Sequence, residues 1–231
     1  EGSIGEMDCF YSSWSTDEPQ GFREEDIAAI RRMVRGLGLA IKCASLTRIV
    51  QTLADVYLGH DAAKRVLAGR INRGAAERIE AVLWYSDLRG YTRISDTASP
   101  DAIIPMLNDY AEAVISSVHE AGGDVLKLIG DGILAIFTNG SSADGCAAAL
   151  KAQALLRKRL LTLNETRIAD GAPATEVYLG VHIGEVFYGN IGSDTRLDFT
   201  VVGPAVNEVS RIDSMCRSVD QDDLLSESFA A

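Results

Sequence analysis

Two acidic motifs, each next to an apolar run, constrain the fold of this 231-residue chain more than any other feature. The segment 81–84 (AVLW) leads directly into 85–92 (YSDLRGYT), so Asp87 is expected at or near the end of a buried strand. The segment 125–137 (VLKLIGDGILAIF) places Asp131 between two glycines and two apolar runs, a pattern typical of a hairpin tip. If the two strands are neighbours, both carboxylates converge on one edge of one sheet.

Such a pair of carboxylates has a specific chemical use. Carboxylate oxygens are hard ligands, and two of them beside Lys127 can hold Mg²⁺ and a polyphosphate. The alternative is that Asp131 is an ordinary turn residue and Asp87 an ordinary strand end. The motifs downstream favour the metal site.

The composition limits the classes of binding partner and the cellular compartment that we expect for this chain. A net charge of −11 argues against nucleic acid or an anionic membrane as the main partner, but a metal and local cations still allow a nucleotide. No run of 18 apolar residues and no signal-peptide pattern is present, so no membrane segment is expected. The four cysteines form no CxxC pair, which indicates reduced, mostly buried thiols and a cytoplasmic location: Cys9, Cys43, Cys146 and Cys216.

The amino-terminal third is predicted to be a remnant of another domain followed by a helical stalk. Residues 1–21 contain one short strand, Cys9 to Trp14, which cannot be stable alone. Residues 22–74 form the stalk and linker, with apolar residues spaced three and four apart at 27, 30, 34, 37, 41 and 44. A second seam at 46, 49, 53 and 56 is out of phase, which is a stutter. An ordinary amphipathic helix packed on its own domain is the alternative to a dimerising stalk.

Residues 75–231 are expected to form one α+β domain. We predict strands at 79–86, 177–181, 185–191 and 198–202, a turn at Ile183-Gly184, the hairpin around Asp131, and helices from Ser99 to Gly122, 142–163 and 205–216. This order is that of a ferredoxin-like split βαβ fold, with helices on one face of a largely antiparallel sheet.

Four motifs in this order resemble the catalytic domain of class III nucleotidyl cyclases. The segments 86–92 (SDLRGYT) and 127–132 (KLIGDG) are similar to that family's two metal motifs, and 184–192 (GEVFYGNIG) and 200–211 (TVVGPAVNEVSR) to two more. The N-terminal piece is similar to the end of a GAF-type sensory domain, so an upstream sensory domain is expected in the full-length protein. The stretch after Arg211 is short for the family, which implies a C-terminally incomplete domain.

The resemblance implies the reaction and the role of each residue. The ribose 3′-hydroxyl of ATP attacks its own α-phosphorus, giving 3′,5′-cyclic AMP and pyrophosphate. Two Mg²⁺ or Mn²⁺ ions per site would be held by Asp87, Asp131 and the backbone carbonyl of Leu88. Asn207 would orient the ribose, Arg211 would meet the charge on the transferring phosphate, and Arg196 is a further phosphate-binding candidate.

Base choice and assembly follow from the same resemblance. Lys127 donates and Thr200 accepts, which suits adenine, whereas a guanine reader would carry Glu in place of Lys127. Metal-binding and base-binding residues of one site come from opposite subunits in this family, so a homodimer would have two complete sites and the stalk could regulate them. The alternatives are a catalytically silent nucleotide-binding dimerisation module, which the intact residue set opposes, and a guanylate cyclase, which Lys127 opposes.

Overall fold

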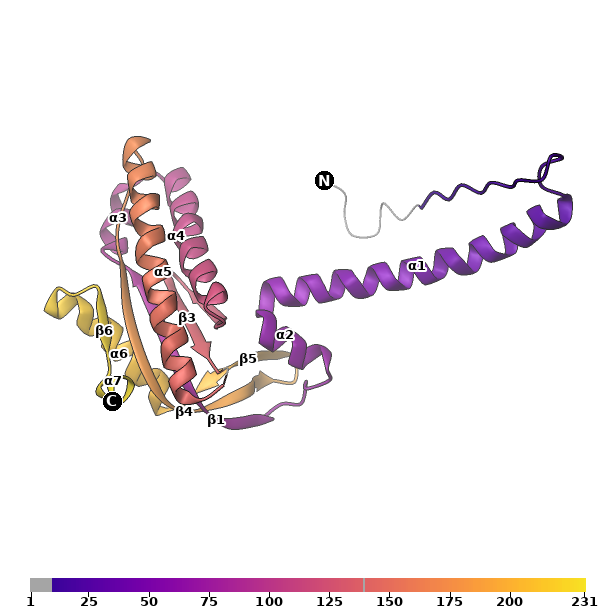
Figure 1. Ribbon diagram of the computed structural model, residues 1–231. Coiled ribbons are helices and arrows are strands. Elements are labelled where there is room, and N and C mark those ends of the chain that lie inside the picture. The colour runs from indigo at the N-terminus through magenta and orange to yellow at the C-terminus, as the bar shows by residue number, and fades with distance from the viewer. Residues whose placement is uncertain (1–9, 139) are drawn as a thin grey trace. The chain divides into compact units, whose positions relative to one another are not determined.

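The computed structural model describes residues 10–138 and 140–231. The chain divides into two units, one ending at Val56 and the other covering Tyr57–Ala231 (Figure 1). The long helix α1 (Glu24–Leu58) dominates the first unit. The second unit contains, in order, α2 (His60–Leu67), β1 (Ala76–Leu88), α3 (Tyr91–Thr97), α4 (Pro100–Glu120), β2 (Asp124–Ile129), β3 (Gly132–Phe137), α5 (Ser142–Ala169), β4 (Val177–Ser193), β5 (Arg196–Val202), α6 (Pro204–Val219), β6 (Asp223–Leu225) and α7 (Glu227–Ala230).

The stalk helix is present as predicted, but the strand before it is not. Residues 10–14 form no strand, and Cys9 lies outside the described residues. Helix α1 is 35 residues long and has no buried residue, so its apolar side chains, such as Leu37, Leu46 and Leu53, are exposed. One 18-residue window of α1 reaches a mean hydropathy of 1.2, which makes α1 long and apolar enough to cross a membrane, although a single helix of this kind is weak evidence for a span. Charged residues such as Arg35, Lys42 and Arg48 interrupt the apolar residues of α1, so the sequence contains no continuous apolar run there.

The sheet confirms the split βαβ arrangement. Its strand order is β2-β3-β1-β4-β5, with antiparallel pairing throughout this path. Strand β1 therefore lies in the centre, where both of its faces can be buried. This explains the continuous apolar run 81–84, all of which is at most 3% exposed, because a strand covered on both sides does not alternate with polar residues.

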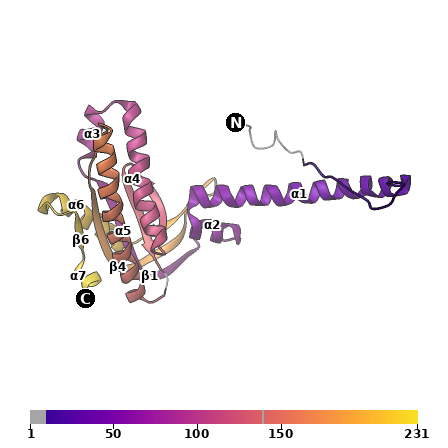
Figure 2. The same cartoon turned by 45° about the horizontal axis from the view of Figure 1, so that its top comes forward.

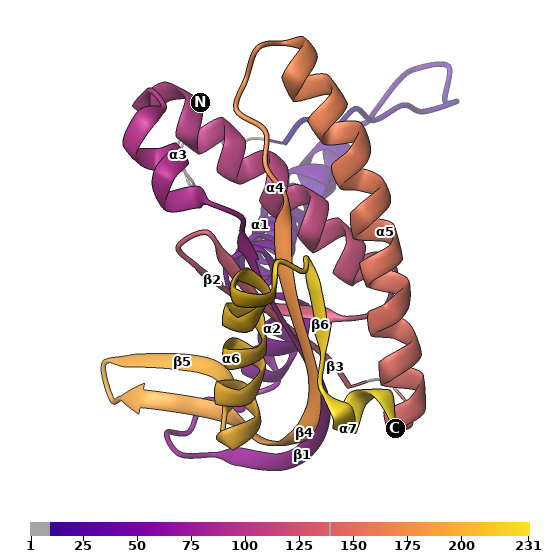
Figure 3. The same ribbon diagram turned by 90° about the vertical axis from the view of Figure 1, so that its left-hand side faces the viewer.

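Helices cover both faces of the sheet, not one face as the sequence suggested. Helices α4 and α5 lie side by side (Figure 2) and pack over one cluster that includes Val82 and Trp84. The opposite face carries a second cluster that includes Leu83, and there α6 and α2 contribute Val209 and Ala62. Figure 3 shows α5 and α6 on opposite sides of strand β4. The spacing of apolar residues predicts a helix but not which face of the sheet it covers.

Strand β4 also differs from the prediction. It runs without a break from Val177 to Ser193, so the turn expected at Ile183-Gly184 is wrong. A Cβ at Gly184 would lie 2.9 Å from the Cβ of Ala205, so this glycine allows α6 to approach closely and does not mark a turn. The short elements α3, β6 and α7 were not predicted; β6 pairs in parallel with β4, and Arg157 holds it through an ion pair with Asp223.

Helix α6 approaches β4 most closely at Gly180. A Cβ there would lie 2.7 Å from both the backbone nitrogen of Asp213 and the carbonyl oxygen of Val209. Gly180 is opposite Tyr85 in β1, two residues before Asp87. The lack of a side chain at one position of β4 therefore sets how near α6 lies to the end of β1.

We expect Gly180→Ala to reduce the free energy of unfolding by about 1–3 kcal/mol, because the added methyl group would overpack the α6 contact. Urea unfolding, followed by the fluorescence of the buried Trp84, would measure the change. Gly36→Ala is the control, because a Cβ there meets nothing within 4 Å. An unchanged stability of Gly180→Ala would contradict the tight contact.

Candidate active site

Asp87 and Asp131 are brought together by strand pairing. Asp87 is the penultimate residue of β1, and Asp131 lies in the tight turn between β2 and β3. Strands β1 and β3 are antiparallel, with Ser86 opposite Ile133, so the end of β1 lies beside the start of β3. Both aspartates line one cavity of about 200 Å³, together with Leu88 and with residues of α4 such as Tyr110. The sequence motifs that predicted convergence are thus adjacent in space.

The charges at this site are not balanced. Burial is the first cause that raises the pKa of Asp87 to about 7, and Asp131 adds to it through hydrogen bonding and repulsion. Asp213 raises the Asp87 pKa further, whereas the backbone N–H of Leu88 opposes these effects. The Oδ1 atom of Asp87 is buried and has no hydrogen-bond partner among the described residues. A buried carboxylate oxygen without a donor is costly, so the site favours a bound cation or a proton.

These features fit a hard divalent cation. The two side chains offer only oxygen ligands, and one of those oxygens is unsatisfied. Within residues 10–138 and 140–231, no group of three or more His, Cys, Asp or Glu side chains has an arrangement suited to metal binding. Asp87 and Asp131 would therefore leave most coordination positions to water or phosphate, which is the usual pattern for Mg²⁺.

Two charged residues near this pair were missed in the sequence. Asp213 on α6 is 4% exposed, and burial, with a contribution from Asp131, raises its pKa to about 7, while Arg217 opposes the shift. Arg217 reaches to 3.9 Å from Oδ2 of Asp87. The available signal was an acid within the apolar stripe of α6, between Val209 and Cys216, where a solvated helix would carry no charge.

The predicted base-binding residues lie on β2 and β5, the strands at the two ends of the antiparallel path. Lys127 on β2 forms an ion pair with Asp198 on β5, so the two edge strands approach each other. Thr200 lies two residues from Asp198, on the same face of β5, and is 7% exposed. Arg196 begins β5 beside the β4–β5 turn, and its backbone nitrogen donates to Ser193. The structure thus places Lys127 near Thr200 and leaves Arg196 in an exposed hairpin.

Asn207 and Arg211 lie on the exposed side of α6. They are one helical turn apart, as predicted, and the guanidinium of Arg211 is 3.0 Å from Glu208. Neither residue lines the cavity that contains Asp87 and Asp131, and neither do Lys127, Thr200 and Arg196. The predicted site residues therefore fall into separate groups within one chain.

A sequence family covers most of the second unit. Residues 75–220 match the adenylate and guanylate cyclase catalytic domain. The chain belongs to this family. The matched residues include strands β1 to β5, helices α3 to α6 and every predicted site residue.

Individual relatives agree with this assignment. An adenylate cyclase of Anabaena cylindrica is 36% identical over 162 residues, which cover 68% of this chain and 32% of the relative. The adenylyl cyclase CyaB of P. aeruginosa superposes with a TM-score of 0.62 at 26% identity, over 67% of this chain and 80% of that chain. The guanylyl cyclase Cya2 superposes with a TM-score of 0.56 at 31% identity, over 60% and 71%. The chain spans about a third of the length of the Anabaena relative.

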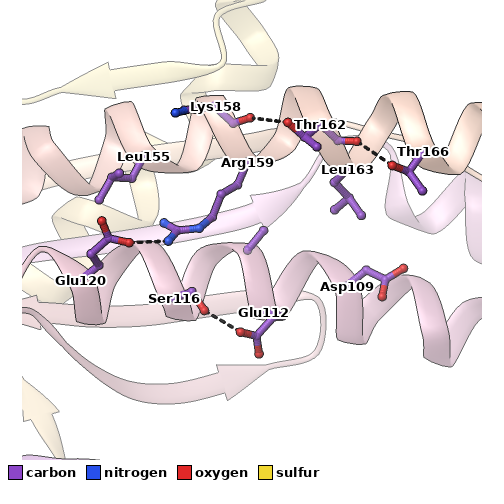
Figure 4. Close-up of a pocket in the computed structure, with 11 residues that line it drawn as sticks. Asp109, Glu112, Ser116, Glu120, Leu155, Lys158, Arg159, Thr162, Leu163 and Thr166 are labelled. Atoms are coloured by element: carbon purple, nitrogen blue, oxygen red, sulfur yellow. Dashed lines mark hydrogen bonds and ion pairs between the residues drawn. The ribbon is translucent and has the colours of Figure 1, made fainter.

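A larger hollow of the cyclase domain lies elsewhere. It has a volume of about 660 Å³ and lies between α4 and α5 (Figure 4). Most of its charged side chains have partners: Arg159 pairs with Glu120, Asp109 pairs with Arg167, and Ser116 donates to Glu112. None of the predicted site residues lines it, so size alone does not identify the active site.

The raised pKa of Asp213 predicts a pH-dependent stability. The unfolded side chain has a pKa of about 3.9, so the folded chain binds this proton more tightly. At low pH, Asp213 is protonated in both the folded and the unfolded chain and does not change the free energy of unfolding. As the pH rises toward about 7, the carboxyl group ionises more readily in the unfolded chain, so the free energy of unfolding falls progressively. We expect Asp213→Asn, which cannot ionise, to lose less stability than the unsubstituted chain between pH 5 and pH 8.

Urea unfolding in EDTA at several pH values would measure this difference. Asp194→Asn is the matched control, because it removes the same charge from a side chain that is 87% exposed. Equal pH slopes for Asp213→Asn and the unsubstituted chain would show that Asp213 ionises normally.

Proposed function

We propose that this chain is the catalytic part of an adenylate cyclase, which converts ATP to 3′,5′-cyclic AMP and pyrophosphate. The observation that carries the proposal is the meeting of Asp87 and Asp131 in one cavity with unbalanced negative charge, inside a domain of the cyclase family. The relatives named above include one adenylate cyclase and one guanylyl cyclase of more than 30% identity, so the choice of base rests on this chain's own residues.

The attacking group belongs to the substrate, so the protein's task is to aim it and to neutralise charge. The 3′-hydroxyl oxygen forms a bond to the α-phosphorus and its proton passes to solvent, while the bond from the α-phosphorus to the bridging oxygen breaks and pyrophosphate leaves with that oxygen. Two Mg²⁺ or Mn²⁺ ions, held by Asp87, Asp131 and the carbonyl of Leu88, would make the hydroxyl more acidic and offset the phosphate charge. Asn207 orients the ribose, and Arg211 and Arg196 meet the phosphate oxygens.

Adenine is selected by Lys127 and Thr200. The ammonium group of Lys127 donates to a ring nitrogen of adenine, and the hydroxyl of Thr200 accepts from the exocyclic amine. The ion pair between Lys127 and Asp198 supports this assignment, because it holds the lysine beside Thr200. Guanine would present an N–H to Lys127, and two donors facing each other cannot pair.

A homodimer would complete each site. The metal-binding aspartates and the outward-facing Asn207 and Arg211 do not share a cavity within one chain. Apolar side chains also remain exposed on the β2–β3 hairpin and on strands β4 and β5: Leu128, Ile129, Phe187, Ile191 and Val202. Exposed apolar residues near polar site residues are typical of an interface. We infer that two copies meet here and that each contributes to both sites.

Regulation would act through α1. The exposed apolar residues of α1 suit a stalk that pairs with a second copy and transmits the state of an upstream sensory domain. Because ATP is the substrate, we place the catalytic domain in the cytoplasm. The competing proposal is a silent nucleotide-binding dimerisation module, and it predicts no product from any nucleotide.

The activity assay also tests base choice. With Mn²⁺, the protein should form cyclic AMP from ATP and little cyclic GMP from GTP. Lys127→Glu should lower the activity with ATP roughly 10- to 100-fold, because the donor to the adenine ring nitrogen is lost. It should also narrow or reverse the preference for ATP over GTP, because the new carboxylate accepts from the guanine N–H.

Lys64→Glu is the control, since it makes the same charge change at an exposed position of α2. No product from either nucleotide would support the silent module. An unchanged preference in Lys127→Glu would remove Lys127 from base recognition.

Shared sites predict complementation between two inactive variants. Asp87→Asn and Arg211→Ala should each lose most activity alone, because each damages both sites of a homodimer. In an equimolar mixture, half of the dimers would be mixed and would keep one intact site, so roughly a quarter of the normal activity should return. Cyclic AMP formation before and after mixing measures this. No recovery, with dimers still forming, would mean that each site lies within one chain.

A further inference from the structure

Helix α6 presents polar groups on two opposite faces. Asn207 is exposed, and the side chain of Arg211 is 68% exposed. Asp213 follows Arg211 by two residues, about 200° around the helix, and is 4% exposed. The outer face thus carries the residues proposed to contact ATP, and the inner face carries one buried carboxylate.

The inner face lies directly over the strand pair that leads to the metal-binding aspartates. A Cβ at Gly180 would be 2.7 Å from the Asp213 nitrogen, so the helix backbone rests on β4 at this point. Gly180 is opposite Tyr85, and Asp87 follows two residues later on the same face of β1. The position of Asp213 is therefore fixed by backbone packing on the strands that hold Asp87.

Asp213 belongs to the charge cluster of the cavity although it is not in the cavity lining. Burial is the first cause that raises the pKa of Tyr85, and the negative charges of Asp213, Asp87 and Asp131 raise it further, with Asp213 first among them. Its Oδ1 atom is buried and, like Oδ1 of Asp87, finds no hydrogen-bond partner in the described part of the chain. A buried, incompletely satisfied carboxylate is stabilised when positive charge arrives nearby.

Arg217 provides the opposite charge on the same helix. It lies one turn after Asp213 and 3.9 Å from Oδ2 of Asp87, and its charge partly opposes the burial that raises the pKa of Asp213. A divalent cation at Asp87 and Asp131 would attract Asp213 and repel Arg217. The attraction of Asp213 and the repulsion of Arg217 both act on α6, and the outer face of this helix carries Asn207 and Arg211.

We propose that Asp213 is a positioning residue through which a divalent cation at Asp87 and Asp131 holds α6 in place over the end of β1. This inference rests on the proposed function and adds a link between the two sites. In a homodimer with shared sites, the cation held by one subunit would set the position of the Asn207 and Arg211 that serve the other site. Occupancy of one metal site would then favour the productive geometry of its neighbour.

Mn²⁺ binding to the purified chain without nucleotide tests the proposal, with affinity measured by calorimetry. Asp213→Asn should weaken Mn²⁺ binding roughly tenfold, because one nearby negative charge is lost. Arg217→Ala should strengthen it, because a competing positive charge is removed. Hydrogen–deuterium exchange of residues 204–219 should slow on adding Mn²⁺ in the unsubstituted chain, and much less in Asp213→Asn.

Two controls separate the possible failures. Asp87→Asn should abolish the binding, and Asp194→Asn, an exposed change of the same charge, should leave it unchanged. If the unsubstituted chain shows no Mn²⁺ binding that depends on Asp87, the proposed metal chemistry fails and this inference with it. If that binding is present but Asp213→Asn affects neither affinity nor exchange, only the role of Asp213 is overturned. A weaker affinity in Arg217→Ala would likewise overturn it, since a purely structural disturbance weakens binding whichever charge is removed.

Discussion

The close approach of two half-buried carboxylates, Asp87 and Asp131, is the constraint on which the candidate site depends. Antiparallel pairing of β1 with β3 places them beside each other, and burial, with Asp131 adding to it, raises the pKa of Asp87 to about 7. Such an arrangement costs stability in the free chain, and the packing of the two apolar clusters around β1 has to offset it. Local strain of this kind persists where the surrounding structure determines the geometry, and it is typical of functional sites.

Sequence reasoning located these two aspartates because their signals are local. A continuous apolar run ending in an acid, and an acid between two glycines, each define a backbone position without reference to the rest of the chain. The spacing of Asn207 and Arg211 on one helix face is also local. Features set within one element were therefore predictable, and so were the order and type of the main elements.

The errors concern residues whose role depends on what packs against them. Gly184 resembles a turn residue in the sequence, but its lack of a side chain accommodates Ala205. Strand β6 has three residues and is defined by pairing with β4 and by the ion pair of Asp223 with Arg157. The position of Asp213 in the apolar stripe of α6 indicates burial, but its place beside the end of β1 is known only from the contact of α6 with Gly180. Cys43 was expected among mostly buried thiols and is exposed, because α1 has no buried residue.

The contact between Gly180 and α6 has an evolutionary consequence. Any side chain at position 180 would lift the helix, and lifting the helix would carry Asp213 away from Asp87. Substitutions at position 180 should therefore be accompanied by changes at positions 209 and 213, which belong to a different element of the chain. Exposed residues on the outer face of α5, such as Leu161, have no such neighbour constraint and are free to diverge separately.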